Sequence, residues 1–153
     1  MATELASKQL ASMDARGRMS FPAVFRNILG DVLYLTQDSD DKGCVIVYSE
    51  DGYSEYCRSM REGLSPYDAS MVMTYIGSVT HMVEPDKMGR ITVPEDLCKF
   101  AGMTSGSVAV VGAGGYAEIW DKERYERFCE KNNEMVRAMI LRKRKQMPAS
   151  TEG

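Results

Sequence analysis

Two short motifs of one type carry the residues best suited to bind a charged ligand. Residues 13 to 22 read MDARGRMSFP, and residues 85 to 94 read PDKMGRITVP. Each contains the pattern D-x-x-G-R, in which Arg18 or Arg90 follows directly after the glycine. A guanidinium in this position can bridge a phosphate or make a bidentate contact to O6 and N7 of guanine. The motifs therefore point to nucleic-acid recognition.

The aspartate and glycine of each motif predict a tight turn that leads into a strand. Asp14 and Asp86 can each accept a backbone N–H through the carboxylate. Gly17 and Gly89 allow a positive φ that a larger residue would resist. The polar and apolar residues that follow alternate, as in a half-buried strand. Each arginine could also pair with the aspartate of its own turn, and that pairing is compatible with DNA contact.

Three further cations near the motifs suit a different role. They are Lys8, Arg16 and Lys87. We expect them to anchor phosphates, because phosphate contacts position a protein on DNA without carrying sequence information.

The two motifs begin two copies of one structural unit. At an offset of 72 residues, positions 14–57 match positions 86–129 at eight identical residues. In each copy a proline is placed to begin a short helix, and a glycine eight residues later is placed to end it. Further strands and a closing helix follow. The pattern predicts an α/β (α+β) protein built from tandem β-α-β repeats.

The repeats divide the chain of 153 residues into four parts. We expect a first repeat at 6–57, a connecting helical segment at 58–77 and a second repeat at 78–130. Residues 131–153 should form a helical extension and a disordered tail, because the apolar pattern is lost after Leu141.

The overall charge argues against DNA binding by general attraction. The formal net charge is −3, whereas phosphate contacts usually dominate affinity for DNA. DNA binding must therefore depend on a local basic patch. The basic run at 142–145 could contribute to one. It could equally be a solvated helix end, where positive charge suits the helix dipole.

The cysteines and the histidine are not spaced as a metal site or a catalytic triad requires. The four cysteines are widely spaced with no C-x-x-C pair, and His81 is the only histidine. Zinc needs clustered ligands, and a catalytic triad needs a nucleophile at recognisable spacing. We therefore expect no enzyme: no catalytic residue, metal, cofactor or small-molecule substrate. With no signal peptide and no apolar run of about 18 residues, we expect a cytoplasmic protein without membrane contact.

The paired motifs resemble those of the MraZ family of bacterial transcriptional regulators. The resemblance covers about residues 6 to 130, including the segments DARGRMSFPAVFRNILGD, GCVIVY, DKMGRITVPEDLCKFAG and AEIWDKERYERF. It implies an AbrB-like swapped-hairpin barrel with peripheral helices, in which the two repeats form a pseudo-symmetric pair within one chain.

The same resemblance implies a function. Such proteins bind short direct repeats of double-stranded DNA through their D-x-x-G-R loops, upstream of the division and cell wall gene cluster that includes their own gene. They typically repress transcription, and their subunits assemble into homo-oligomeric rings. The chain is accordingly expected to be nucleoid-associated. A non-catalytic protein-interaction scaffold that uses the same barrel is the alternative.

Two positions depart from the family pattern. Gln37 stands where a basic residue is common, and Met88 occupies a position in the second loop that is often polar or basic. The first loop keeps Arg16 at the corresponding position. We therefore expect the first loop to make the stronger DNA contact.

Overall fold

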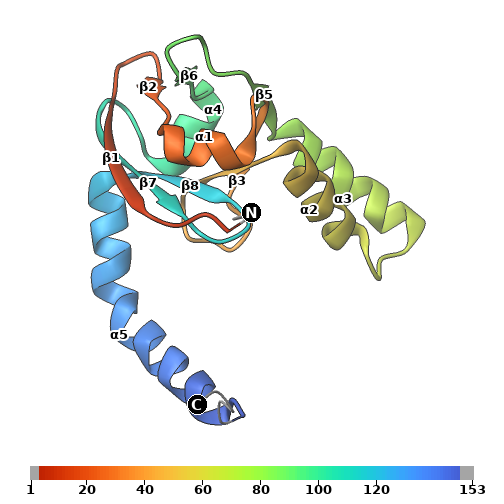
Figure 1. Ribbon diagram of the computed structural model, residues 1–153. Coiled ribbons are helices and arrows are strands. Elements are labelled where there is room, and N and C mark those ends of the chain that lie inside the picture. The colour runs from red at the N-terminus through yellow and green to blue at the C-terminus, as the bar shows by residue number, and fades with distance from the viewer. Residues whose placement is uncertain (1–3, 149–153) are drawn as a thin grey trace. The chain divides into compact units, whose positions relative to one another are not determined.

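The computed structural model describes residues 4–148, which form eight strands and five helices. In chain order these are β1 (Lys8–Met13), β2 (Arg18–Ser20), α1 (Ala23–Leu29), β3 (Leu33–Gln37), β4 (Val45–Tyr48), α2 (Glu50–Arg61), α3 (Pro66–Ser78), β5 (His81–Val83), β6 (Arg90–Thr92), α4 (Glu95–Ala101), β7 (Gly106–Gly112), β8 (Ala117–Asp121) and α5 (Lys122–Gln146). The chain divides into two compact units, Met1–Lys122 and Glu123–Gly153. The first unit contains all eight strands, and its boundary cuts the predicted second repeat, 78–130, at the start of α5 (Figure 1).

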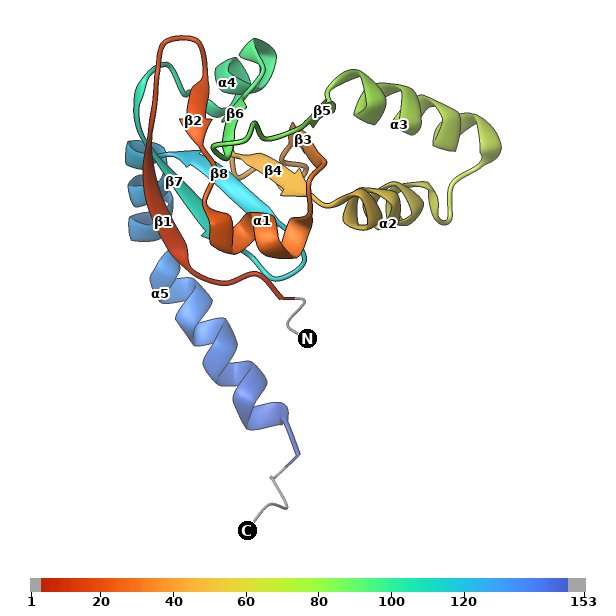
Figure 2. The same cartoon turned by 45° about the horizontal axis from the view of Figure 1, so that its top comes forward.

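The strands form one nearly closed barrel in which every neighbouring pair is antiparallel. Their order is β5-β3-β4-β8-β7-β1-β2-β6, so strands of one repeat lie between strands of the other (Figure 2). Most of the pairing therefore joins the two repeats to each other. This arrangement confirms the predicted α+β class and the swapped-hairpin barrel.

Elements that lie 72 residues apart in the sequence are equivalent in the structure. β2 and β6 correspond residue for residue, and so do α1 and α4. In the β2–β6 ladder Met19 lies opposite Ile91, which is its own counterpart in the other repeat. In the β4–β8 ladder Ile46 lies opposite its counterpart, Glu118. A pseudo-two-fold axis therefore passes through the barrel at these two pairs.

One of the two axial pairs contains a buried charge. The side chain of Glu118 is buried, accepts a hydrogen bond from Trp120 Nε1 at 3.0 Å and pairs with the ammonium group of Lys42. Because a buried carboxylate is tolerated only when it is paired and hydrogen-bonded, these contacts explain how it is accommodated. They also tie the β3–β4 connection of the first repeat to β8 of the second.

Apolar side chains from both repeats fill the barrel. The fully buried members of this core include Phe21, Phe25, Leu33, Leu35, Leu97 and Ile119. The predicted alternation after each motif is confirmed, since Met19 and Phe21 are buried while Arg18 and Ser20 are exposed. The same pattern recurs in the second copy. The strand that carries each arginine is thus fixed by its buried neighbours.

The short helices also begin and end where the sequence predicts. Pro22 and Pro94 precede α1 and α4, and Gly30 and Gly102 follow their last residues. Each helix turns its apolar face to the core: Phe25 and Leu29 from α1, and Leu97 and Ala101 from α4, are buried there.

Helices α2 and α3 pack against each other at one side of the barrel (Figure 1). The Ser49 and Ser65 hydroxyls cap their first turns by accepting the N–H groups of Gly52 and Asp68. Aromatic stacking joins α2 to the barrel. The Tyr53 ring lies 4.7 Å from that of Tyr34, and the Tyr56 ring lies 5.0 Å from that of Tyr48.

The second compact unit is mainly α5, which contains no buried residue. Its exposed apolar side chains include Met135, Met139, Ile140 and Leu141, and its last turn is basic. The tail predicted to be disordered falls largely on residues 149–153, outside the described part of the chain. Between residues 4 and 148, no helix combines the length and the apolar character that a membrane span requires.

Phe25→Ala should lower the free energy of unfolding by about 3–5 kcal/mol, because it leaves a cavity among fully buried side chains. Its neighbour Val24 is an exposed residue of the same helix, so Val24→Ala should change that energy by less than about 0.5 kcal/mol. Urea denaturation followed by circular dichroism measures both. Equal effects of the two variants would contradict the described packing of α1.

Candidate nucleic-acid interface

Each D-x-x-G-R motif forms the predicted turn, held by its aspartate. Asp14 Oδ1 accepts the backbone N–H groups of Arg16 and Arg18 at 2.9 and 3.0 Å. In the second copy Asp86 Oδ1 accepts those of Met88 and Arg90 at 2.8 and 2.9 Å. The glycine that follows has φ +82° in the first turn and +78° in the second. The two loops are therefore close conformational copies.

The pairing of each arginine with its own aspartate is also present. Arg18 Nε donates to Asp14 Oδ2 at 2.7 Å, and Arg90 Nε donates to Asp86 Oδ2 at 3.1 Å. Both arginine side chains are 58% exposed. Exposed ion pairs add little stability, so the main effect is to orient the guanidinium. The two terminal nitrogens of a guanidinium supply four further N–H donors, which these bonds leave unused.

The two loops also hold each other. Phe21, just after β2, donates its backbone N–H to the Gly89 carbonyl of the second loop at 2.9 Å. Val93, just after β6, donates to the Gly17 carbonyl of the first loop, also at 2.9 Å. Each loop is thus bonded to the other repeat, which fixes the position of the two loops relative to each other.

This exchange brings the two arginines onto one face. In the β2–β6 ladder Arg18 lies opposite Thr92, and Arg90 lies opposite Ser20. All four side chains are exposed. The arginines are therefore diagonal neighbours, about 7–8 Å apart at their backbones, on either side of the pseudo-two-fold axis.

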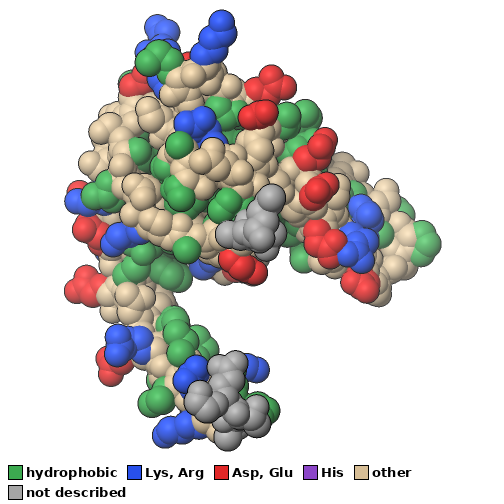
Figure 3. All heavy atoms as spheres, viewed as in Figure 1, with side chains coloured by type: hydrophobic (Ala, Val, Ile, Leu, Met, Phe, Trp, Pro, Cys, Tyr) green, Lys and Arg blue, Asp and Glu red, His purple; other side chains and the backbone are tan. Residues whose placement is uncertain are grey.

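A groove of about 670 Å³ runs between the loops. Its polar lining includes Asp14, Arg18, Ser20, Asp86, Arg90 and Thr92. Figure 3 shows lysine and arginine side chains projecting over the β1–β2 and β5–β6 loops at this end of the barrel. Glu84 also lines the groove, so its charged lining is two arginines and three acids, and the further cations of this edge, Arg16 and Lys87, come from the loop tips.

The other predicted anchors divide into two groups. Arg16 and Lys87 are exposed in the loops themselves, next to the turn residues. Lys8 is exposed as well, but it is the first residue of β1, whereas the loop follows the last, Met13. At about 3.3 Å per residue, the length of this strand keeps Lys8 well away from the turns. The structure therefore does not bring Lys8 to the groove.

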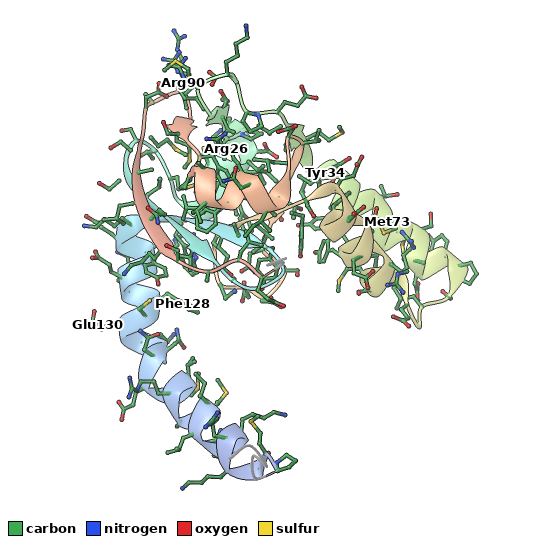
Figure 4. All side chains as sticks on the ribbon, viewed as in Figure 1. Arg26, Tyr34, Met73, Arg90, Phe128 and Glu130 are labelled. Atoms are coloured by element: carbon green, nitrogen blue, oxygen red, sulfur yellow. The ribbon has the colours of Figure 1, made fainter. Side chains whose placement is uncertain are left out.

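Arg26, which lies outside both motifs, contacts the second loop. Its Nε donates to the Phe21 carbonyl at 3.1 Å, and its guanidinium covers Gly89, where an added Cβ would lie 2.7 Å from Nη2. Figure 4 shows Arg26 projecting from α1 and Arg90 at the loop end of the barrel. The position that corresponds to Arg26 in the second repeat is Cys98, whose thiol lies against Gly17. The one signal in the sequence for this contact with Gly89 is the position of Arg26, about one turn into α1.

The cysteines are spread through the fold. Cys44, Cys57 and Cys98 are buried and Cys129 is partly buried. Burial raises the pKa of the Cys98 thiol, which keeps it protonated at neutral pH. Within residues 4–148, no three cysteine, histidine or acidic side chains come together as metal ligands would.

The turns should persist into mild acid. The Arg18 backbone N–H, then its guanidinium, hold the pKa of the Asp14 carboxyl below its ordinary value of 3.8. The Arg90 backbone N–H does the same for the pKa of Asp86. A lowered pKa means that the contribution of the carboxylate is present above about pH 3.8 and is lost as pH falls through the folded pKa. Carboxyl ¹³C shifts followed by NMR should give midpoints below 3.8 for both residues.

Asp14→Asn is the matched variant for this titration. Its side chain carries no titrating charge, so the first loop should lose its acid transition while the second keeps it. Midpoints at or above 3.8 in the unchanged protein would contradict the hydrogen bonding described for the turns.

Gly17→Ala should destabilise the protein more than Gly89→Ala. Each places a side chain in the left-handed region, at about 1–2 kcal/mol. At Gly17 the new Cβ would also lie 2.5 Å from the Val93 carbonyl oxygen, a backbone atom that cannot move aside. At Gly89 it meets the mobile end of Arg26. Urea denaturation should give a further loss of about 1–3 kcal/mol at Gly17, and equal losses would contradict the reciprocal contact.

Comparison with known proteins identifies the family. A family model described as "MraZ protein, putative antitoxin-like" matches residues 77–146. The chain is 36% identical over 118 residues to Transcriptional regulator MraZ of Paenarthrobacter aurescens (strain TC1), covering 76% of this chain and 80% of that protein. It is 33% identical over 124 residues to the protein of the same name from Dictyoglomus thermophilum, covering 80% and 82%. The chain belongs to the MraZ family of transcriptional regulators.

Proposed function

We propose that this transcriptional regulator binds double-stranded DNA sequence-specifically through its two D-x-x-G-R loops and acts by binding, without catalysis. The observation that carries the proposal is the placement of Arg18 and Arg90. Both guanidinium groups are oriented by an aspartate, both are 58% exposed, and the β2–β6 ladder places them side by side. Membership of a family of transcriptional regulators supports the same conclusion.

The aspartates prepare the arginines for recognition. Holding Nε fixes the plane of each guanidinium before DNA arrives, which lowers the entropy lost on binding. The terminal nitrogens then have the geometry for a bidentate contact to guanine, worth about 1–3 kcal/mol of discrimination. An arginine in such a contact cannot be replaced by lysine without loss, because an ammonium group is a point donor.

Neighbouring side chains would position the duplex. Arg16 and Lys87 lie in the loops on either side of the groove, where they would meet phosphates. The hydroxyls of Ser20 and Thr92 lie between the two arginines and can also donate to phosphate oxygens. Since Lys8 lies at the far end of β1, we do not assign it to this surface.

One subunit presents few cations, so its own affinity should be low. We propose that subunits assemble into a ring and engage short direct repeats in series, which multiplies weak contacts through effective concentration. We further propose that the target is the division and cell wall gene cluster that includes the gene for this protein, as the resemblance of the paired motifs implies. Repression there would place the protein on the nucleoid, in the cytoplasm.

Selection of bound duplexes from a random DNA library should enrich a short repeated element. Affinity for that element should fall steeply as salt rises, because bound phosphates release counterions. Arg18→Ala should abolish specific binding. Arg18→Lys should keep salt-dependent binding but lose discrimination by about 1–3 kcal/mol if Arg18 reads a guanine.

Arg58→Ala provides a matched control. Arg58 is an exposed arginine paired with Glu55 on α2, away from the loops, so its loss should leave DNA affinity unchanged. Size-exclusion chromatography should show that all three variants assemble normally. No enrichment and no binding at low salt would overturn the proposal and favour a protein-interaction scaffold.

A further inference from the structure

The two loops share a backbone but differ at their tips. At the two variable positions of D-x-x-G-R, the first loop has Ala15 and Arg16, and the second has Lys87 and Met88. The side chain of Met88 is 74% exposed, the most exposed of the large apolar residues in the described chain. The second loop therefore presents a long apolar side chain where the first presents a guanidinium.

Met88 is held in place by the turn. Its backbone N–H donates to Asp86 Oδ1 at 2.8 Å, as that of Arg16 donates to Asp14 Oδ1 at 2.9 Å. The pseudo-two-fold axis relates these two positions. Met88 therefore starts from a fixed backbone beside Lys87 and Arg90.

We propose that Met88 is a specificity-determining residue that packs against the 5-methyl group of a thymine. The inference rests on the proposed DNA binding of the loops. Met88 is an apolar side chain flanked by two cations. This combination suits DNA, which is anionic at its phosphates and has an apolar group, the thymine methyl, in its major groove. The thymine methyl is the apolar group that DNA presents on its major-groove edge. Binding would remove the exposed Met88 side chain from water, which favours the contact.

The difference between the tips gives the DNA element a direction. Arg18 and Arg90 obey the pseudo-two-fold axis and could read a palindrome equally well in either orientation. Arg16 and Met88 break that symmetry, since one contacts phosphate and the other a base. The element bound by one subunit is therefore asymmetric, and successive subunits that face the same way would require direct repeats.

Replacing thymine with uracil tests the contact, because it removes only the methyl group. Each thymine of the element selected by the unchanged protein is replaced in turn, and the affinity of the full-length protein is measured by fluorescence anisotropy. At one position per subunit the affinity should fall about fourfold, which corresponds to one buried methyl group. In Met88→Ala the same replacement should have no effect. Met71→Ala, which removes an exposed methionine of α3, should respond to uracil like the unchanged protein.

Met88→Arg gives an independent readout. It makes the second loop resemble the first, so the plot of log affinity against log salt should steepen by about 0.9 for each added phosphate contact. Preference for thymine at that position should also disappear from a repeated library selection.

The two proposals fail in different ways. If the unchanged protein selects no element, DNA binding itself is wrong, and the role of Met88 falls with it. An element whose affinity is insensitive to uracil everywhere, or equally sensitive in Met88→Ala, would overturn the role of Met88 alone. So would a change of oligomeric state in Met88→Ala without loss of thymine preference, since Met88 would then contact another subunit.

Discussion

Two backbone hydrogen bonds make the rest of the structure possible: Phe21 to the Gly89 carbonyl, and Val93 to the Gly17 carbonyl. Because each loop accepts a hydrogen bond from the strand end of the other repeat, the two loops are fixed relative to each other. The bonds fix the β2–β6 ladder, and the ladder puts Arg18 and Arg90 on one exposed face. The recognition surface is thus a product of the interdigitated barrel.

Some residues of this surface are related by the pseudo-two-fold axis, and others are not. The turn aspartates, the glycines and the two arginines obey the pseudo-two-fold axis closely. The residues around them do not: Arg26 covers the second loop where Cys98 lies against the first, and the loop tips carry different side chains. A symmetric frame therefore holds an asymmetric set of contacts, as a regulator needs if it is to distinguish the two strands of its site.

Much of the conformation of each repeat can be predicted from local sequence. Asp14 and Gly17 dictate a turn, alternation dictates the face of Arg18, and Pro22 and Gly30 set the bounds of α1, because each depends on neighbours in the chain. The position of Arg26 over Gly89 could not be predicted in this way, because it depends on which strands pair, and an alternating pattern does not identify the partner strand. The distance of Lys8 from the loops follows from the length of β1, a strand that the motif pattern does not include.

The pairing of β1 with β7 has a consequence for biosynthesis. Lys8 lies opposite Val111 and Met13 opposite Gly106, so β1 cannot form this ladder until β7 has been synthesised. During translation, the first repeat leaves the ribosome with its strand edges open until about residue 121, the end of β8, has followed. The barrel can close only late in synthesis, and its long-range pairing makes that closure slow. The nascent chain is therefore the state in which this regulator is most exposed to aggregation and to chaperones.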